Sequence, residues 1–215
     1  AERVAVVRDP LGWGVAPQVA AAARSTALTA AGWAVDDVEP PLIEEAATLW
    51  RRISTTEMVG AFLPGALPVP LSHGSTRYFL DNAEETEVLA SGEAYGGAWA
   101  QRAVIAAAWE RFQAEYPIVL GPVSARRMPE IGYDLSGPAA TTELWRDHRL
   151  LVTVNFLGLP SVAVPTGLDE DGLPTGVQLI GPRNADHISL AAARDVEAAL
   201  GGLTPVEARV AGAVA

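Results

Sequence analysis

The first 40 residues carry the pattern that most restricts the fold of this chain. A short β-branched run at 3–8 predicts a buried strand that ends in a turn. Helical spacing starts at Pro17, where a missing N–H costs nothing, and stops at Gly32. Residues 33–39 then alternate as a second strand. A strand, a helix and a strand in so short a segment predict a right-handed βαβ unit, and therefore two parallel strands.

The rest of the chain continues the α/β pattern. Helices are expected at 42–62, 93–115, 139–154 and 186–200, and strands at 117–123, 161–165 and 176–181. The proline-rich stretch 63–92 is expected to be an irregular or helical insertion with a short helix near 74–85. Asp171-Gly172 is a turn signal, so the last two strands should be antiparallel. We predict one α/β domain over 1–202 with a mixed, mainly parallel sheet, and a loosely held tail at 203–215.

Composition excludes several classes of function. The 215 residues include 26 acidic and 15 basic ones, and the net charge of −11 repels a nucleic-acid backbone. The chain has no cysteine, so it has neither a disulfide nor a cysteine-ligated metal. No apolar run approaches the roughly 20 residues that span a bilayer. We therefore expect a cytoplasmic protein that binds neither nucleic acid nor membranes.

All 15 basic residues are arginines. Arginine stays protonated in proteins and cannot act as a general base or as a Schiff-base amine. Lysine chemistry is therefore excluded for this chain by itself. The chain begins with Ala1, and its first methionine is Met58. Removal of an initiator methionine and a start inside a larger fold explain this beginning equally well.

A glycine-containing turn between the first strand and the first helix is one candidate binding site. Gly12-Trp13-Gly14 is followed some 20 residues later by Asp36, Asp37 and Glu39, which is the outline of a dinucleotide-binding fingerprint. The third glycine of that fingerprint is absent, and the loop from Asp9 is long for a phosphate-binding turn. A plain reversal of the chain explains these glycines better.

Histidines, serines and arginines give few other candidates. His73, His148 and His187 have no partner at metal-ligand spacing, so no metal site is predicted, and no G-x-S-x-G motif presents a serine nucleophile. Arg126-Arg127 follow the strand at 117–123, near Glu130 and Asp134, and can hold an anionic group. A solvated basic pair, as expected for Arg51-Arg52, is the simpler interpretation.

Two segments near the C-terminal end carry a resemblance to a known family. The sequences NFLGLPSVAVPTG at 155–167 and GLPTGVQLIGPR at 172–183 resemble the C-terminal signature of the amidase signature family. The earlier strand, alanine-rich helix and V-x-x-V-E-P-P strand stand in the order that such enzymes carry after their catalytic core. The resemblance implies the C-terminal portion of an amidase-like α/β/α sandwich. Its structural signature residues are Asn155, Gly158, Pro160, Pro165, Gly167, Gly172, Gly176, Gln178 and Gly181.

The chemistry of these signature residues suits scaffold roles. Gly158 and Pro160 permit a sharp crossing from helix to strand, and Asn155 can hydrogen-bond backbone groups that the turn leaves unpaired. Gly172 permits a positive φ in the connection between the strands. Gly181 lets another backbone approach the end of its strand closely. We expect none of these residues to be catalytic.

The resemblance also shows what this sequence lacks. The family uses a serine nucleophile, a bridging serine in a Gly/Ser-rich loop and a neutral lysine as base, and this chain has neither that loop nor a lysine. We therefore expect the C-terminal half of an amidase, either a fragment or a natural subunit, which contributes pocket walls but no catalytic residue and no cofactor. Its partner would be the N-terminal catalytic half or a second copy. The alternatives are an inactive binding module with the amidase fold and the nucleotide-binding domain considered above.

One position bears on the substrate. In the tRNA amidotransferase relatives, an acidic residue seven positions before the signature asparagine contacts the substrate amine, and His148 stands there in this sequence. Imidazole is a poorer partner for an ammonium group than a carboxylate, so arylalkyl or aliphatic amides are expected rather than glutamine. The resemblance implies that His148, Ser124 and Arg126 line the substrate pocket, although each of them also fits a structural role.

Overall fold

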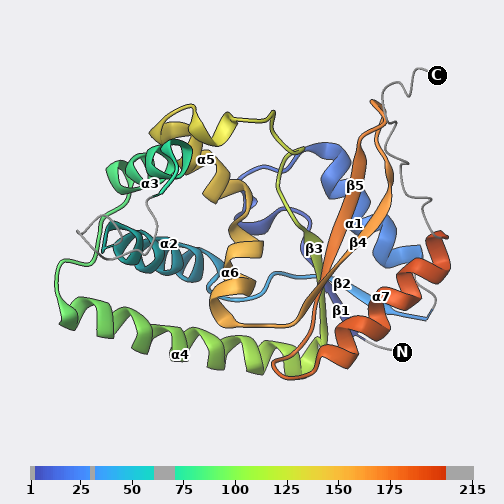
Figure 1. Cartoon of the computed structure of the whole chain (residues 1–215). Coiled ribbons are helices and arrows are strands. Elements are labelled where there is room, and N and C mark those ends of the chain that lie inside the picture. Colours follow the sequence, from blue (N-terminus) through green and yellow to red (C-terminus); the bar gives the residue numbers. More distant parts are fainter. Residues whose placement is uncertain (1–2, 30–31, 61–70, 202–215) are drawn as a thin grey trace, which may run out of the picture.

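The computed structural model describes residues 3–29, 32–60 and 71–201; the predicted tail at 203–215 and the expected loop at 63–70 lie outside them. A five-stranded sheet stands between layers of helices (Figure 1). β1 runs parallel to β2 and β3, whereas β5 runs antiparallel to β3 and β4. The sheet is mixed as predicted, but it is not mainly parallel: parallel and antiparallel pairings are equal in number among the described residues. The strand order is β2 (Ala34–Asp37), β1 (Arg3–Val6), β3 (Ile118–Pro122), β5 (Pro174–Ile180) and β4 (Ser161–Leu168).

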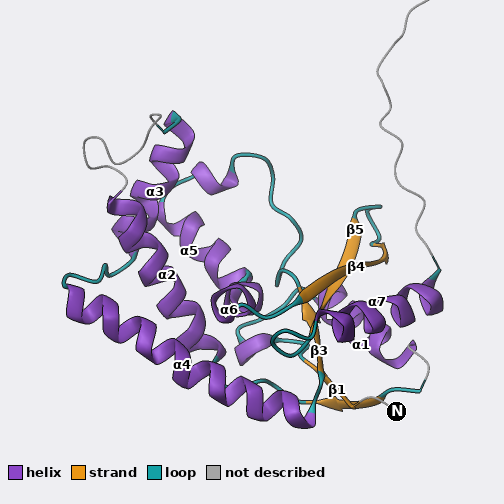
Figure 2. Ribbon diagram, turned by 60° about the horizontal axis from the view of Figure 1, so that its bottom comes forward, coloured by secondary structure: helices purple, strands orange, loops and turns teal. Residues whose placement is uncertain are grey.

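Helices cover both faces of this sheet (Figure 2). One face is covered by α1 (Pro17–Thr29) and α7 (Asp186–Leu200). The other is covered by α2 (Ile43–Gly60), α4 (Gly92–Glu115) and α6 (Arg149–Leu157). The helix expected near 74–85 is α3 (His73–Glu85), which packs against α2 and α5 (Pro138–Asp147). In the described part of the chain, no helix combines the length and the apolar composition needed to cross a bilayer.

The alternation of side chains along β1 and the residue that follows it shows how the two cores form. Val4 and Val6 pack into the core beneath α1 and α7, whereas Ala5 and Val7 pack into the larger core beneath α2, α4 and α6. These four residues are at most 2% exposed. Successive side chains of a strand point to opposite faces, so a strand that is covered on both sides is apolar throughout. The two cores confirm the predicted α/β/α arrangement.

The β4–β5 hairpin is attached to the rest of the sheet by a buried amide. Gln178 lies on β5 and is 1% exposed. Its Nε2 donates to the Pro122 carbonyl at 2.8 Å, and its Oε1 accepts a hydrogen bond from Ser161 Oγ at 3.3 Å. Gly181 follows this strand, and a Cβ there would lie 2.4 Å from Ser189 Oγ on α7. The glycine is therefore required for the close approach of α7, as the sequence suggested.

The turn that connects α6 to β4 agrees with the sequence-based expectation at Gly158 but not at Asn155. Gly158 ends α6 in the left-handed conformation, with φ of 69°, and its N–H donates to the Val154 and Asn155 carbonyls. The Leu157 carbonyl accepts a hydrogen bond from Arg102 Nη2 at 3.0 Å. The Asn155 side chain is exposed and makes no hydrogen bond with the described residues, so its expected bond to the backbone is wrong. The carbonyl groups of the turn instead accept hydrogen bonds from backbone N–H groups and from Arg102 on α4.

The helix predicted at 139–154 is two helices. α5 ends at Asp147, α6 begins at Arg149, and His148 between them has φ of −98° and ψ of 15°. The guanidinium of Arg149 is 1% exposed and donates to the Pro10 carbonyl at 2.5 Å and to Asp9 Oδ1 at 3.1 Å. The break between α5 and α6 coincides with this contact between Arg149 and the turn after β1. The helical spacing of the sequence does not reveal such a contact.

Candidate functional site

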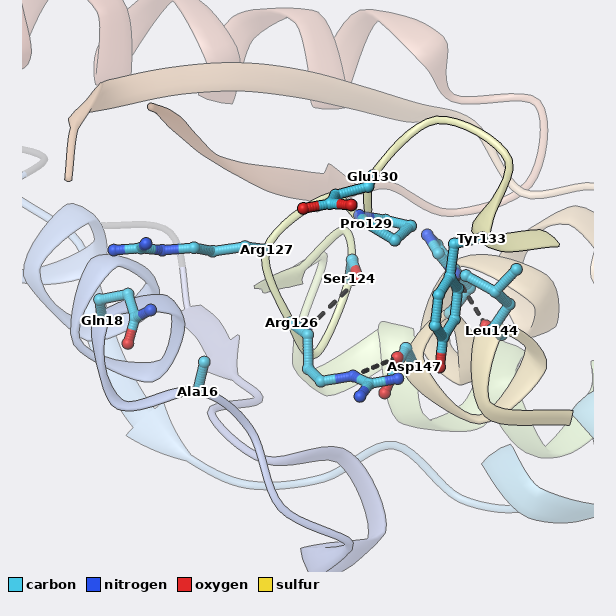
Figure 3. Close-up of a pocket in the computed structure, with 11 residues that line it drawn as sticks. Ala16, Gln18, Ser124, Arg126, Arg127, Pro129, Glu130, Tyr133, Leu144 and Asp147 are labelled. Atoms are coloured by element: carbon cyan, nitrogen blue, oxygen red, sulfur yellow. Dashed lines mark hydrogen bonds and ion pairs between the residues drawn. The ribbon is translucent and has the colours of Figure 1, made fainter. Parts of the chain in front are cut away.

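A cavity of about 440 Å³ lies at the carboxyl end of β3 (Figure 3). It is bounded by the loop that follows β3, by the start of α1 and by the end of α5. Ala125 joins these three parts, because its N–H donates to the Asp147 carbonyl and its carbonyl accepts from the Ala16 N–H, each at 2.8 Å. The carboxyl ends of parallel strands are where α/β sheets place their ligands. The fold therefore builds this cavity at an expected position for a site.

Three residues expected from the sequence line this cavity together: Ser124, Arg126 and His148. Ser124 Oγ accepts a long hydrogen bond of 3.4 Å from the Arg126 N–H. His148 Nδ1 lies 2.8 Å from the Leu144 carbonyl oxygen. Because a carbonyl can only accept, Nδ1 carries the proton and Nε2 is an acceptor in the neutral ring. The structure brings the three residues together, and their contact with a substrate stays a prediction.

Arg126 is already paired with carboxylates. Its Nε donates to Asp147 Oδ2 at 2.6 Å (Figure 3). Its Nη2 donates to Glu143 Oε2 at 3.1 Å, and the Tyr133 hydroxyl donates to the same Glu143 oxygen. The hydrogen bond from Tyr133 and the Arg126 cation lower the pKa of Glu143, and the same hydrogen bond raises the pKa of Tyr133. Two carboxylates against one guanidinium leave the group with net negative charge, which disfavours an anionic ligand.

Arg127 points away from Arg126 and pairs with a different element (Figure 3). Its Nε lies 2.8 Å from Asp169 Oδ2, and its Nη1 donates to Asp171 Oδ2. Both acids belong to the connection between β4 and β5, so Arg127 ties that turn to the loop after β3. The interpretation of Arg126-Arg127 as a solvated pair is right only in part: the Arg126 side chain is exposed, but each guanidinium is held by carboxylates that are distant in sequence.

Sequence reasoning did not identify Tyr133 or Glu143 as residues of this site. Glu143 and Asp147 are four positions apart on α5 and therefore share one face of the helix, which was a usable signal. Tyr133 comes from an irregular loop without periodicity, and nothing in its sequence neighbourhood places it against α5. Glu130, which is near the arginines in sequence, lines the cavity but forms no ion pair with either of them among the described residues.

The glycine turn after β1 does not form a phosphate-binding cradle. The Gly14 N–H donates to the Asp9 carboxylate at 3.1 Å, and the Leu11 N–H donates to Glu39 Oε2 at 2.9 Å. Amides that would hold a pyrophosphate thus already bind carboxylates of this chain, and the negative charges repel a phosphate. The geometry counts against the nucleotide-binding alternative and supports the plain reversal of the chain.

The remaining candidates lie elsewhere. His73 begins α3 and His187 stands in the first turn of α7, and both are exposed. Arg52 pairs with Glu87 at 3.1 Å. Arg51 is not the surface residue that was expected: it is half-buried, its Nη2 donates to Thr142 Oγ1 at 2.9 Å, and its guanidinium lies over the ring of Trp145.

Comparison with known proteins identifies the family. The model of the amidase family matches residues 2–190. The chain belongs to the amidase family. The indoleacetamide hydrolase of Bradyrhizobium japonicum is 34% identical to this amidase chain over 204 residues, which are 94% of the chain and 43% of that protein. A glutamyl-tRNA(Gln) amidotransferase subunit of Lachnospira eligens is 39% identical over 80 residues, which are 37% of this chain and 16% of that protein.

Solved structures show the same fold. A 6-aminohexanoate cyclic dimer hydrolase complexed with substrate superposes with a TM-score of 0.70 at 24% identity, over 94% of this chain and 46% of that one. The corresponding glutamyl-tRNA(Gln) amidotransferase subunit of Thermotoga maritima gives a TM-score of 0.69 at 21% identity, over 92% and 42%. The amidase-like fold is confirmed, and the chain spans less than half the length of these relatives.

Proposed function

We propose that this chain forms the substrate-binding part of an amidase that hydrolyses the C–N bond of neutral carboxamides, with arylalkyl or aliphatic amides as its substrates. The observation that carries the proposal is the cavity at the carboxyl end of β3 in a chain of the amidase family. The 34% identity to a protein named indoleacetamide hydrolase supports an arylalkyl amide as substrate. The N-terminal catalytic half, with the nucleophile and the lysine base, would be the partner, because this sequence contains no lysine.

The charges around the cavity support a neutral substrate. The guanidinium groups that line it in the described part of the chain belong to Arg126 and Arg127, and both are paired with acids. Glu130 adds a further carboxylate to the lining. A ligand with its own carboxylate would therefore enter a negative field, whereas a carboxamide has no net charge. This distribution favours an uncharged amide over an anionic carboxylate such as the product acid.

His148 is suited to position the carboxamide. Its Nδ1–H is committed to the Leu144 carbonyl, which orients the ring and leaves Nε2 as an acceptor. A carboxamide NH₂ group has two N–H donors, and one of them can bind this nitrogen. His148 would then be a binding residue for the amide nitrogen, which is the leaving group of the hydrolysis.

Calorimetric titration of the 215-residue chain tests the proposal. Hexanamide and phenylacetamide should bind, whereas phenylacetate should bind at least about tenfold more weakly because of the negative lining. Glutamine should also bind more weakly, because an imidazole stands where a carboxylate would pair with its ammonium group. His148→Ala should lower the affinity for both amides about three- to tenfold, which corresponds to one hydrogen bond. His187→Ala, which changes an exposed histidine on α7, is the matched control and should have no effect. Equal or tighter binding of the carboxylates, or no binding of either amide, would contradict the proposal.

A further inference from the structure

A second cavity of about 400 Å³ adjoins the first one. Leu144 and His148 line both cavities, so the two are neighbours at the end of α5. The walls of the second cavity are otherwise mostly aromatic and aliphatic, and small-molecule sites of roughly 300–1,000 Å³ are typically lined in this way. Its remaining lining residues are Tyr78, Asp134, Trp145, Leu151 and Val152.

The indole ring of Trp145 is fixed in this wall. Its Nε1 donates to Asn82 Oδ1 at 2.7 Å, and Asn82, which is 1% exposed, donates in turn to the Tyr78 carbonyl at 3.0 Å. The guanidinium of Arg51 lies 5.9 Å from the centroid of the same ring. Because the indole N–H is satisfied inside the protein, Trp145 offers only apolar surface to the cavity. A wall that is already ordered loses little conformational entropy when a ligand binds.

Leu151 presents uncovered apolar surface in the same cavity. It lies on α6, three residues after His148, and is 36% exposed, whereas Leu150 beside it is 2% exposed and belongs to the core. Apolar surface gains free energy when it is removed from water. Asp134 is the one carboxylate that lines this cavity in the described part of the chain, and it disfavours an anionic ligand there. The second cavity therefore suits an uncharged, flat or branched apolar group.

We infer that the second cavity binds the aryl group of the substrate while the carboxamide lies in the first cavity beside His148. This inference rests on the proposed function. Tyr78, Trp145 and Leu151 are then specificity-determining residues that favour arylalkyl amides over short amides. Acetamide occupies only the first cavity and makes no contact with these residues, whereas phenylacetamide reaches them past Leu144.

Binding of phenylacetamide and acetamide to two matched variants of the 215-residue chain tests the inference. Leu151→Asp places a charge in the second cavity, at a side chain that is already partly in water and is not needed for the core. It should lower the affinity for phenylacetamide at least about tenfold and change the affinity for acetamide less than twofold. Leu190→Asp is the control, because Leu190 is an exposed leucine on α7, and it should leave both affinities unchanged. Circular dichroism checks that both variants are folded.

The outcomes separate this inference from the proposed function. If phenylacetamide binds Leu151→Asp as tightly as wild type while His148→Ala weakens it, the aryl site is wrong and the proposed function stands. An equal loss of affinity for both amides in Leu151→Asp would also overturn the inference, because acetamide should not contact residue 151. If the wild-type chain binds neither amide, the inference and the proposed function both fail.

Discussion

Gln178 shows how much of this fold depends on single buried polar groups. Its side-chain amide donates to the Pro122 carbonyl on β3 and accepts a hydrogen bond from Ser161 on β4. One side chain on β5 therefore joins the two strands that flank it. A buried polar atom that loses its partner costs more free energy than the bond contributed, because the remaining group is not hydrated. These hydrogen bonds support the structural role that we expect for Gln178.

We predict that Gln178→Leu lowers the free energy of unfolding by about 1–3 kcal/mol, because it leaves the Pro122 carbonyl unpaired. Urea denaturation measures this change. Gln101→Leu, at an exposed position on α4, should stay within about 0.5 kcal/mol of wild type. Equal effects of the two substitutions would show that the buried amide bond does not stabilise the sheet.

Glu143 gives a prediction about pH. Its pKa is lowered by the hydrogen bond from Tyr133 and by Arg126. A carboxyl group with a lowered pKa stabilises the folded state above its unfolded pKa, which is about 4.3 for glutamate, and this contribution is lost as the pH falls through the folded pKa. Wild type should therefore be more stable than Glu143→Gln at neutral pH, and the difference should shrink as the pH falls below about 4.

Urea denaturation of wild type and Glu143→Gln between neutral and acidic pH measures this difference. Glu84→Gln is the control, because Glu84 is exposed on α3 and makes no ion pair with a described residue. A difference for Glu143→Gln that is independent of pH would contradict the account of the site.

The residues of the site were predictable only where they stand in a motif or directly after a strand. Ser124 and Arg126 follow β3, and His148 is fixed by its distance from Asn155, so all three were named from the sequence. The partners of Arg126 were not named from the sequence. Asp147 and Glu143 lie about 20 residues away, on a helix whose orientation depends on tertiary packing. Pairing over such a distance has no periodic signal.

At the scale of elements, the junction of α5 and α6 places the site. His148 stands at this junction, and Arg149 beside it is buried against the turn after β1. The guanidinium also donates to the Arg146 carbonyl at 2.8 Å and lies 5.5 Å from the centroid of the Trp13 ring. Burial lowers the pKa of Arg149, but an arginine remains charged. This contact fixes the direction in which α6 leaves the cavity.

We predict that Arg149→Met lowers the free energy of unfolding by about 2–4 kcal/mol, because it leaves Asp9 and the carbonyls of Pro10 and Arg146 without this donor. Arg111→Met, at an exposed position on α4, should stay within about 0.5 kcal/mol of wild type. Thermal and urea denaturation both measure the change. A small effect at Arg149 would mean that the turn after β1 does not hold α6.

Elements with a strong local signal were predicted well. The βαβ unit at the start, the hairpin around Asp171-Gly172 and the helix near 74–85 are all present. The break at His148 was not predicted, because residues 139–154 are compatible with one continuous helix and only the buried Arg149 contact reveals the change of direction. Local propensity determined the elements, and tertiary contacts determined their ends.

At the scale of the molecule, the sheet ends in strands with one free side. β4 pairs only with β5, and β2 only with β1, among the described residues. Unpaired N–H and C=O groups on an outer strand are a template for pairing with another chain. The relatives are more than twice as long as the matched region, so additional protein is available in them to cover such an edge.

We predict that the 215-residue chain associates with itself, so that its sedimentation coefficient rises with concentration. Ala163→Lys places a charge on the outer strand β4 and should reduce this association. Ala191→Lys, at an exposed position on α7, should leave it unchanged. A monomer at all concentrations would contradict the prediction.

Release of ammonia from phenylacetamide tests the central claim most directly. The chain is predicted to supply the walls of an amide-binding pocket while the reactive serine and lysine reside in other residues of the enzyme. Purified to homogeneity, the 215-residue chain should release no ammonia, whereas the chain combined with the proposed N-terminal catalytic half, on one polypeptide or as a separate subunit, should release ammonia catalytically. Turnover by the 215-residue chain alone, or no turnover by the two halves together, would contradict the account.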